Sequence, residues 1–450
     1  FYSKVAISMA EMLTLIAFSF VLGISIITNV SILIALFIGL ILFISYALYR
    51  KFTLRQIGQM IISGIRETKT IIIIFPLIGM LTALWRAGGT IPFIIYHTVP
   101  LIDPEFFVMS AFLLCSLVSC LTGTAFGTAS TMGIICMMIG KTLGIPAFYL
   151  GGAILSGIFF GDRCSPMSSS ALLVSELTGT NIYININNMI KTSIVPFIFT
   201  VALYAITGHI SSGKVSAEDV AVFAQNFNLS PWVLLPALII IILTLRKVNI
   251  KITIICSIIA AAMVCVFLQG MSIFELFSTM MVGYHSNNAE LAALIDGGGI
   301  ISMLKTIAIV AISSSYFGIF RHTKLLDKIK QWSYTLALHS SNFAAVLIVS
   351  IITGALSCNQ TLATMLTYEI TEKHVPDREK LAVYLENSVI LTSALIPWSI
   401  AATFPITTIG APINCILYAV YLYAVPIWNL FVSFMNSRIS AQRQKFFYLL

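Results

Sequence analysis

Charged side chains are scarce in this sequence. Asp, Glu, Lys and Arg together make up 9% of the 450 residues, whereas hydrophobic residues make up 58%. A water-soluble domain usually carries about a quarter charged residues, because its surface faces water. A chain with so little charge needs lipid to cover it. The composition therefore argues against an ordinary soluble enzyme and indicates a helical membrane bundle.

Motifs for metal, disulfide or nucleotide chemistry are also missing. The eight cysteines form no CxxC pair and lie mostly in apolar segments, where small buried thiols are the ordinary interpretation. The six histidines are scattered, so we assign none of them a role. No metal-ligand cluster, nucleophile elbow or phosphate-binding loop is visible. We therefore expect no enzymatic activity and no cofactor.

Basic residues outnumber acidic ones by 25 to 17, which gives a net charge of +8. In a soluble protein this excess would suggest nucleic acid as a partner. Here the basic residues cluster in short loops between apolar segments, as the positive-inside rule expects of a membrane protein. We therefore expect membrane lipid and a small ion or small organic solute as partners, and no nucleic acid.

Apolar segments long enough to cross a bilayer recur along the chain. A transmembrane helix needs roughly 17–25 residues. By that measure we expect crossings near 9–29, 30–49, 70–86, 105–122, 190–209, 232–246, 252–268, 299–319, 341–357 and 411–434. Two apolar regions, 123–189 and 358–410, are too rich in Gly, Pro and hydroxyl residues to be plain spans. The sequence predicts an all-α integral membrane protein with about 10–12 transmembrane helices plus broken or re-entrant helical hairpins.

The basic loops set the expected orientation. Lys and Arg cluster at 50–69, 246–251, 321–330 and near the C-terminus. The segment 269–296 contains neither. Because basic loops face the cytoplasm, we expect both termini there, in a multi-pass protein of the cell membrane. The chain begins with Phe1, so we also expect some residues before it, and no cleavable signal peptide is recognisable.

The same orientation gives the two interrupted regions opposite directions. Region 123–189 starts and ends inside, whereas region 358–410 starts and ends outside. Lys373, Arg378 and Lys380 then lie outside, where the positive-inside rule does not expect basic residues.

Three pairs of landmarks recur at one spacing. They are Thr122-Gly123 with Thr353-Gly354 (353 − 122 = 231), Pro166 with Pro397 (397 − 166 = 231), and Gly179 with Gly410 (410 − 179 = 231). Together with the opposite directions, this spacing predicts two inverted repeat halves, 1–225 and 226–450. In transporters of that kind, alternating access arises from the pseudo-symmetry, and the binding site lies near the middle of the membrane.

The segment 122–131, Thr-Gly-Thr-Ala-Phe-Gly-Thr-Ala-Ser-Thr, alternates small and hydroxyl residues. Such a segment fits a backbone that leaves the helix, so that carbonyl and hydroxyl oxygens line a polar cavity suited to Na⁺. Close packing of small residues between helices is the alternative. Thr122, Thr124 and Thr128 are the candidate ligands.

A second polar segment reads Gly161-Asp162-Arg163-Cys164-Ser165-Pro166 and continues into three serines, 168–170. Acids inside a membrane are costly and are functional by default. Pro166 also keeps the residue before it out of the helix, which frees backbone groups. The alternative is a short loop with a solvated Asp-Arg pair. We take Asp162, Ser165, Ser168 and Ser169 as candidate site residues.

A third segment places Glu386, Asn387, Ser388 and Thr392 in a hydrophobic stretch that Pro397 then breaks. Glu386 is the best candidate for a proton-carrying carboxylate, because burial disfavours the charged form of a carboxyl group. The alternative is an interfacial Glu at the start of a helix.

The second copy of the 122–131 segment, at 353–361, offers neutral amide ligands in Asn359 and Gln360. Asp162 and Glu386 are the two carboxylates that we expect to bind the coupling ion, Na⁺ or H⁺.

These segments resemble the NhaC family of sodium/proton antiporters, which also includes malate/lactate exchangers. The resemblance covers about 54–430 and rests on motifs in the family's order: Thr122-Gly-Thr-x-x-Gly-Thr, Gly161-Asp162-Arg163-x-Ser165-Pro166, Leu385-Glu386-x-Ser388 and Leu395-Ile-Pro397-Trp398. It implies an ion-coupled antiporter of the ion-transporter superfamily type, with inverted repeats, broken helices and a homodimeric assembly.

The chain departs from the family at two places. NhaC-like proteins typically read Ser-Pro-Leu-Ser-Asp-Thr-Thr-Asn, whereas this chain has serines at 168–170 and lacks that Asp and Asn. They also typically read Leu-Glu-Asp-Ser, where this chain has Asn387. Fewer carboxylates and more hydroxyls fit an organic solute.

Two functions therefore stay open. One is a Na⁺/H⁺ antiporter of the NhaC type that works by alternating access. The other is an exchanger or symporter of small organic acids or amino acids on the same scaffold. A channel would need a continuous pore filter, and two breaks near the membrane midplane in inverted copies argue for alternating access instead.

Overall fold

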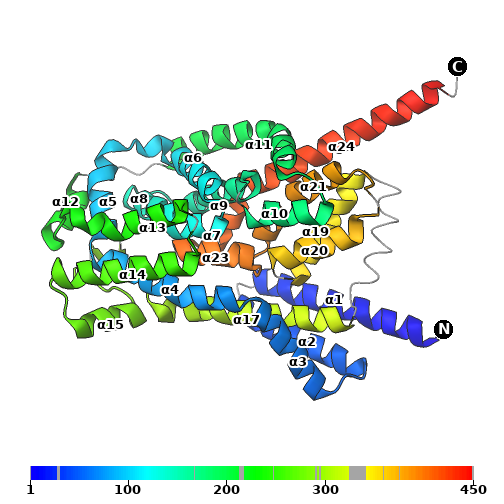
Figure 1. The fold of residues 1–450 in the computed structure, drawn as a ribbon, viewed down its shortest axis with the longest axis horizontal. Coiled ribbons are helices and arrows are strands. Elements are labelled where there is room, and N and C mark those ends of the chain that lie inside the picture. Colours follow the sequence, from blue (N-terminus) through cyan, green and yellow to red (C-terminus); the bar gives the residue numbers. More distant parts are fainter. Residues whose placement is uncertain are drawn as a thin grey trace.

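The computed structural model describes residues 2–27, 31–166, 168–211, 217–246, 248–288, 291–292, 295–323, 341–357, 359–373 and 375–447. Within these ranges the chain is helical apart from loops and one isolated bridge between Tyr284 and Gly297. The helices form one elongated bundle (Figure 1). We call the end where α1 begins and α24 finishes the terminal end, because both termini lie there.

The helices up to residue 226 are α1 (Tyr2–Ile27), α2 (Ile32–Tyr49), α3 (Leu54–Glu67), α4 (Lys69–Ala87), α5 (Thr90–Thr98), η1 (Val99–Leu101), α6 (Pro104–Thr122), α7 (Ala125–Thr128), η2 (Ala129–Gly133), α8 (Ile134–Thr142), α9 (Ala147–Cys164), α10 (Ser169–Thr178), α11 (Ile182–Ser211) and α12 (Ala217–Asn226). The later helices are η3 (Pro231–Leu234), α13 (Leu235–Leu245), α14 (Ile250–Phe267), α15 (Ile273–Val282), α17 (Ile300–Thr323), α19 (Asn342–Ser357), α20 (Gln360–Thr371), α21 (Arg378–Asn387), α22 (Val389–Thr392), η4 (Ser393–Leu395), α23 (Ile400–Ile409), η5 (Ile413–Tyr418) and α24 (Val420–Phe447).

Several of these helices are long and apolar enough to cross a membrane. Among the described residues, three helices qualify alone, namely Pro104–Thr122, Ile182–Gly208 and Ile300–Phe320. Two bent pairs also qualify: Ile72–Ala87 with Thr90–Leu101, at 59°, and Arg378–Leu395 with Ile400–Ile409, at 54°. The prediction of an all-α membrane protein with broken helices is confirmed. Helices α3, α5, α12 and α15 were not expected, because they are too short or too polar to be found as spans.

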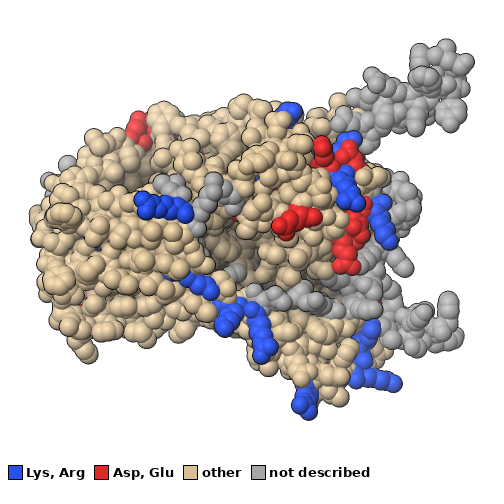
Figure 2. Space-filling view, viewed as in Figure 1, with Lys and Arg blue, Asp and Glu red and all other residues tan. Residues whose placement is uncertain are grey.

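The surface also fits a lipid environment. Figure 2 shows a broad, nearly uncharged area on the half of this face away from the termini, with most acidic and basic side chains on the half toward the terminal end. Helix α11 leaves Ile198, Phe199 and Ile206 more than half exposed. Exposed apolar side chains in this number are expected only where lipid covers them.

Helix α9 packs against α6 through two glycines four residues apart. A Cβ atom on Gly157 would lie 2.6 Å from the Phe112 carbonyl oxygen, and one on Gly161 would lie 2.3 Å from the Cys120 nitrogen. Helix backbones approach this closely only where the side chain is a hydrogen atom, as in GxxxG contacts. The contact fixes the C-terminal turn of α9, which carries Asp162.

Helix boundaries around the two proline breaks recur at the spacing seen in the sequence. Helix α9 spans Ala147–Cys164, and the run from α21 to η4 spans Arg378–Leu395, which is 231 residues later at both ends (378 − 147 and 395 − 164). Helices α10 and α23 are related by the same offset (400 − 169 and 409 − 178). Their N-caps are both serines, Ser168 and Ser399.

Helix α20 turns back along α19 instead of crossing onward. The Thr353 and Thr367 hydroxyls are 2.7 Å apart, so the two helices form a hairpin. The turn after α20 therefore returns to the side where α19 began. There Arg378 donates a 3.5 Å hydrogen bond to the Thr178 carbonyl at the end of α10.

This hairpin corrects one expectation. Counting every apolar segment as a full crossing placed the basic residues at 373–380 on the opposite side from region 123–189. In the structure they lie beside the α10–α11 turn, near the terminal end. The basic residues at 373–380 and the α10–α11 turn therefore lie at the same end of the bundle, because α20 returns along α19.

Candidate functional site

The first break in the bundle separates α9 from α10. Ser165 has an extended backbone (φ −99°, ψ 133°) because Pro166 follows it, and α9 ends one residue earlier. Helix α10 restarts at its N-cap, Ser168, whose hydroxyl accepts from the backbone N–H groups of Ser170 and Ala171. The last turn of α9 thus faces the N-terminus of α10, the end of a helix that stabilises negative charge.

Asp162 lies in that last turn, buried and surrounded by donors. Its Oδ1 accepts from the Ser168 hydroxyl at 3.1 Å, and its Oδ2 accepts from the Ser170 hydroxyl at 2.8 Å. The backbone N–H of Ala125 and the Gln360 side chain also approach this carboxylate. The N-terminal residues of α7, α10 and α20 therefore meet around one acid, and their donors offset part of the cost of burying its charge.

Glu386 is the second buried acid, with 1% of its surface exposed. Arg163 and Asp162 lie within electrostatic range of it. Within the described part of the chain, neither of its carboxylate oxygens has a hydrogen-bond partner. A charged carboxylate in such a place is costly, so a bound proton or a bound cation would stabilise it.

Arg163 is fully buried and is anchored to other helices. Its guanidinium donates to the Tyr421 hydroxyl at 2.7 Å and to the Met189 carbonyl at 3.0 Å. Its Nε is buried and has no partner among the described residues. The alternative of a solvated Asp-Arg pair in a surface loop does not fit, because both side chains are buried in the bundle.

These three side chains set the charge of the site. With both carboxylates ionised, Asp162, Glu386 and Arg163 sum to −1. A single Na⁺ or a single proton brings the sum to zero. Because uncompensated charge in a protein interior is expensive, the arrangement favours one monovalent cation at a time.

The threonines of the first crossover are bonded mainly to one another. The Thr122 and Thr128 hydroxyls are 3.0 Å apart, and Thr128 also donates to the Thr124 carbonyl at 2.9 Å. Thr124 is the N-cap of α7 and accepts from the Gly127 N–H at 3.3 Å. These hydrogen bonds of the three threonines fix the backbone of residues 122–128, which includes Ala125, whose N–H approaches Asp162.

The two amides of the second crossover have different positions. Asn359 is the N-cap of α20, and its side chain accepts from the Thr361 and Leu362 N–H groups. Gln360 approaches Asp162 and also donates to the Ile390 carbonyl at 3.1 Å. Gln360 therefore contacts residues of both interrupted regions, whereas Asn359 caps the N-terminus of α20.

The remaining predicted residues of the third segment lie along α21 and α22. Asn387 is buried and donates to the Thr192 hydroxyl of α11 at 3.2 Å, while its Oδ1 has no partner in the described chain. Thr392 is also buried, with its hydroxyl unpartnered there. Ser388 donates back to the Tyr384 carbonyl at 2.6 Å, within its own helix.

The structure gathers part of the predicted set. Asp162, Ser168, Gln360 and Glu386 belong to one buried centre, and Ser165 is buried in the break beside it. Ser169 is exposed, on the other side of α10.

Three further residues, Ser170, Tyr421 and Thr192, complete the site and were not predicted. The run of serines was a signal for Ser170. Nothing local in the sequence points to the other two, because they reach the centre from distant helices.

Comparisons with known proteins agree with this architecture. The sequence profile of the Na⁺/H⁺ antiporter family matches residues 157–436, which include both proline breaks and both buried acids. The malate-2H⁺/Na⁺-lactate antiporter of Bacillus subtilis strain 168 is 30% identical over 361 residues, 77% of each chain. The Na⁺/H⁺ antiporter NhaC of Alkalihalophilus pseudofirmus is 26% identical over 88% of each chain. The arginine/ornithine antiporter ArcD of Halobacterium salinarum is 28% identical over 76% of this chain and 73% of its own length.

Proposed function

Because the chain belongs to the Na⁺/H⁺ antiporter family, and is therefore a membrane antiporter and not an enzyme, we propose that it exchanges Na⁺ for H⁺ at the buried centre of Asp162 and Glu386. In this proposal Asp162 is the fixed anion, held by Ser168 and Ser170. Glu386 is the group that alternately holds the proton and shares the cation.

The observation that carries the proposal is the contrast between the two acids. Asp162 has its charge compensated by donors from three helix starts, whereas Glu386 has no donor among the described residues. With both carboxylates ionised the centre has a net charge of −1, so Na⁺ and H⁺ compete for it. Competition of two ions for one site is what couples their opposite movements in an antiporter.

The helix boundaries support alternating access between two inverted halves, 1–225 and 226–450. The first proline break and the second interrupted region meet at one centre, where the Gln360 side chain at the start of α20 approaches Asp162 of α9. Rocking of one half against the other would expose such a centre to each side in turn. We place both termini in the cytoplasm, because the basic residues at 50–69 and 373–380 then face inward.

A transport assay tests the proposal. Purified protein in liposomes that contain a pH-sensitive dye should respond to an imposed Na⁺ gradient with proton movement in the opposite direction. A saturable response to Na⁺ that protein-free liposomes lack would support the exchange. No response to Na⁺ or Li⁺ would contradict it.

A second candidate is exchange of a small organic acid or amino acid. Two observations favour it: the names of two relatives, and the replacement of two family carboxylates by Ser169 and Asn387, of which Asn387 lies next to Glu386. Arg163 also offers a buried Nε without a partner in the described chain, which suits a substrate carboxylate. Uptake of labelled malate, lactate, arginine or ornithine, without a Na⁺ response, would select this candidate.

A further inference from the structure

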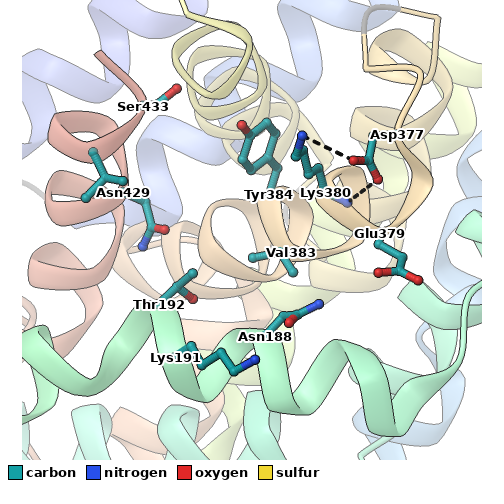
Figure 3. Close-up of a pocket in the computed structure, with 11 residues that line it drawn as sticks. Asn188, Lys191, Thr192, Asp377, Glu379, Lys380, Val383, Tyr384, Asn429 and Ser433 are labelled. Atoms are coloured by element: carbon teal, nitrogen blue, oxygen red, sulfur yellow. Dashed lines mark hydrogen bonds and ion pairs between the residues drawn. The ribbon is translucent and has the colours of Figure 1, made fainter. Parts of the chain in front are cut away.

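Helices α11, α21 and α24 enclose a cavity of about 410 Å³ near the terminal end. Figure 3 shows its three walls, with Asn188 and Lys191 on α11, Tyr384 on α21, and Asn429 and Ser433 on α24. A water molecule occupies about 30 Å³ in the liquid, so a cavity of this size and polarity holds several.

The cavity leads from an exposed mouth to a buried floor. At the mouth, the side chains of Lys380 and Asp377 are 68% and 47% exposed and form an ion pair at 3.3 Å. Deeper in the cavity, Val383 and Asn429 are buried at 8% exposure. Thr192 of α11 lines the cavity and is hydrogen-bonded to Asn387, the residue after Glu386.

Hydrogen bonds connect Thr192 to Asn387 on α21 and, through a backbone carbonyl of α11, to Arg163. The Thr192 hydroxyl accepts from Asn387, the neighbour of Glu386, at 3.2 Å, and donates to the Met189 carbonyl at 3.0 Å. The same carbonyl accepts from Arg163 at 3.0 Å. Thr192 is therefore one hydrogen bond from Asn387, the residue after Glu386, and shares the Met189 carbonyl with Arg163.

The charged residues around the mouth balance one another. Lys191 and Lys380 face Asp377 and Glu379, two positive charges against two negative ones. Because these four charges sum to zero, the mouth has no net positive charge that would repel a small cation.

We propose that this cavity is the aqueous vestibule through which Na⁺ and protons reach Glu386 from the side of the membrane where the termini lie. The Asn387–Thr192 pair forms its inner closure. The inference rests on the proposed function for the identity of the ions, but the vestibule itself is testable without transport.

Accessibility of introduced cysteines tests the vestibule. Asn188 lines the cavity, whereas Ile190, two residues later on α11, is 45% exposed on the bundle surface and should face lipid. Asn188→Cys and Ile190→Cys are compared in membrane vesicles of both orientations. The reagent is a membrane-impermeant, positively charged methanethiosulfonate, and the reaction of the native cysteines is subtracted.

We expect Asn188→Cys to react only from the side of the membrane where the termini lie, at least tenfold faster than Ile190→Cys. Protease digestion of a C-terminal tag in the same vesicles identifies that side. Reaction of Asn188→Cys from the other side only, no reaction from either side, or equal reaction of the two variants would overturn the vestibule. These readouts need no transport, so absence of Na⁺/H⁺ exchange in the unmodified protein would contradict the proposed function alone.

The inner closure has its own pair of variants. Thr192→Val removes the hydroxyl but keeps the shape, whereas Thr192→Ser keeps the hydroxyl. We expect Thr192→Val to lower the exchange rate at least tenfold and Thr192→Ser to retain most of it. Unchanged labelling of Asn188→Cys in the Thr192→Val background shows that the fold is intact. Normal exchange by Thr192→Val would overturn the role of this pair.

Discussion

Asp162 and Glu386 lie within electrostatic range of each other in the buried centre, yet hydrogen bonds hold only the first of them. Asp162 receives two serine hydroxyls, at 3.1 and 2.8 Å. The carboxylate oxygens of Glu386 have no partner in the described chain. This difference suggests different roles for the two acids. Hydrogen bonds favour the ionised form of Asp162, whereas Glu386 needs a bound proton or a bound cation to balance its charge.

Replacing Glu386 by Gln should abolish proton coupling. The amide keeps the size of the side chain but carries neither charge nor a titrating proton. We expect Na⁺-driven proton movement in dye-loaded liposomes to fall at least tenfold, to the level of protein-free liposomes. Glu176→Gln is the control, because Glu176 is an exposed acid on α10 and its replacement should leave the rate unchanged. Retained exchange by Glu386→Gln would remove Glu386 from the mechanism.

Replacing Asp162 by Asn should weaken Na⁺ binding. The centre then has a net charge of zero before any cation binds, and the donors from Ser168 and Ser170 no longer face a full negative charge. We expect the Na⁺ concentration for half-maximal exchange to rise at least tenfold. Asp103→Asn is the matched control: Asp103 is the exposed N-cap of α6, and Asn caps a helix as well as Asp does. An unchanged Na⁺ dependence in Asp162→Asn would show that the cation binds elsewhere.

Ser168 and Ser399 offer a matched comparison of stability. Both are N-caps, but only Ser168 also donates to a buried carboxylate. Loss of a cap costs about 1 kcal/mol, and loss of a hydrogen bond to a charged group costs about 1.5–3 kcal/mol. Ser168→Ala should therefore lower the thermal unfolding temperature in detergent more than Ser399→Ala does. Equal shifts would mean that the Asp162 contact adds nothing to stability.

The close contact of α9 with α6 predicts a sensitive glycine. A Cβ atom on Gly161 would lie 2.3 Å from the backbone nitrogen of Cys120, whereas one on Gly58 of α3 would meet nothing within 4 Å. Gly161→Ala must push α9 away from α6 and should destabilise the protein by about 1–3 kcal/mol. Gly58→Ala should be neutral or stabilise by up to about 1 kcal/mol. The thermal unfolding temperatures of both variants, compared with that of the unmodified protein, test this prediction. An unchanged unfolding temperature for Gly161→Ala would contradict the close contact of α9 with α6.

Much of the fold could be predicted because local chemistry determines it. Pro166 and Pro397 each follow the end of a helix, and a serine two residues after each caps the next helix. Hydropathy also located the long spans. It could not show that α20 folds back along α19, because an apolar helix that returns and one that crosses have the same composition. The Thr353–Thr367 contact that reveals the hairpin is a tertiary one.

The site was predictable only where its residues lie close together in the sequence. Asp162 and Ser168 are six residues apart, and their segment is too polar for its surroundings. The partners of Arg163 are Tyr421 and Met189, which are 258 and 26 residues away. Asn359 was expected as a ligand because amide oxygens bind ions. Asn is also a favoured N-cap residue, and in the structure Asn359 caps α20.

The central claim is that one cation and one proton compete for the centre of Asp162 and Glu386. The most direct test measures proton release when Na⁺ is added to the purified protein in weakly buffered detergent solution with a pH indicator. The account predicts about one proton released for each Na⁺ bound, from the net charge of −1 at the centre. It also predicts no release from Glu386→Gln. Binding of Na⁺ without proton release, or equal release from Glu386→Gln, would contradict the account.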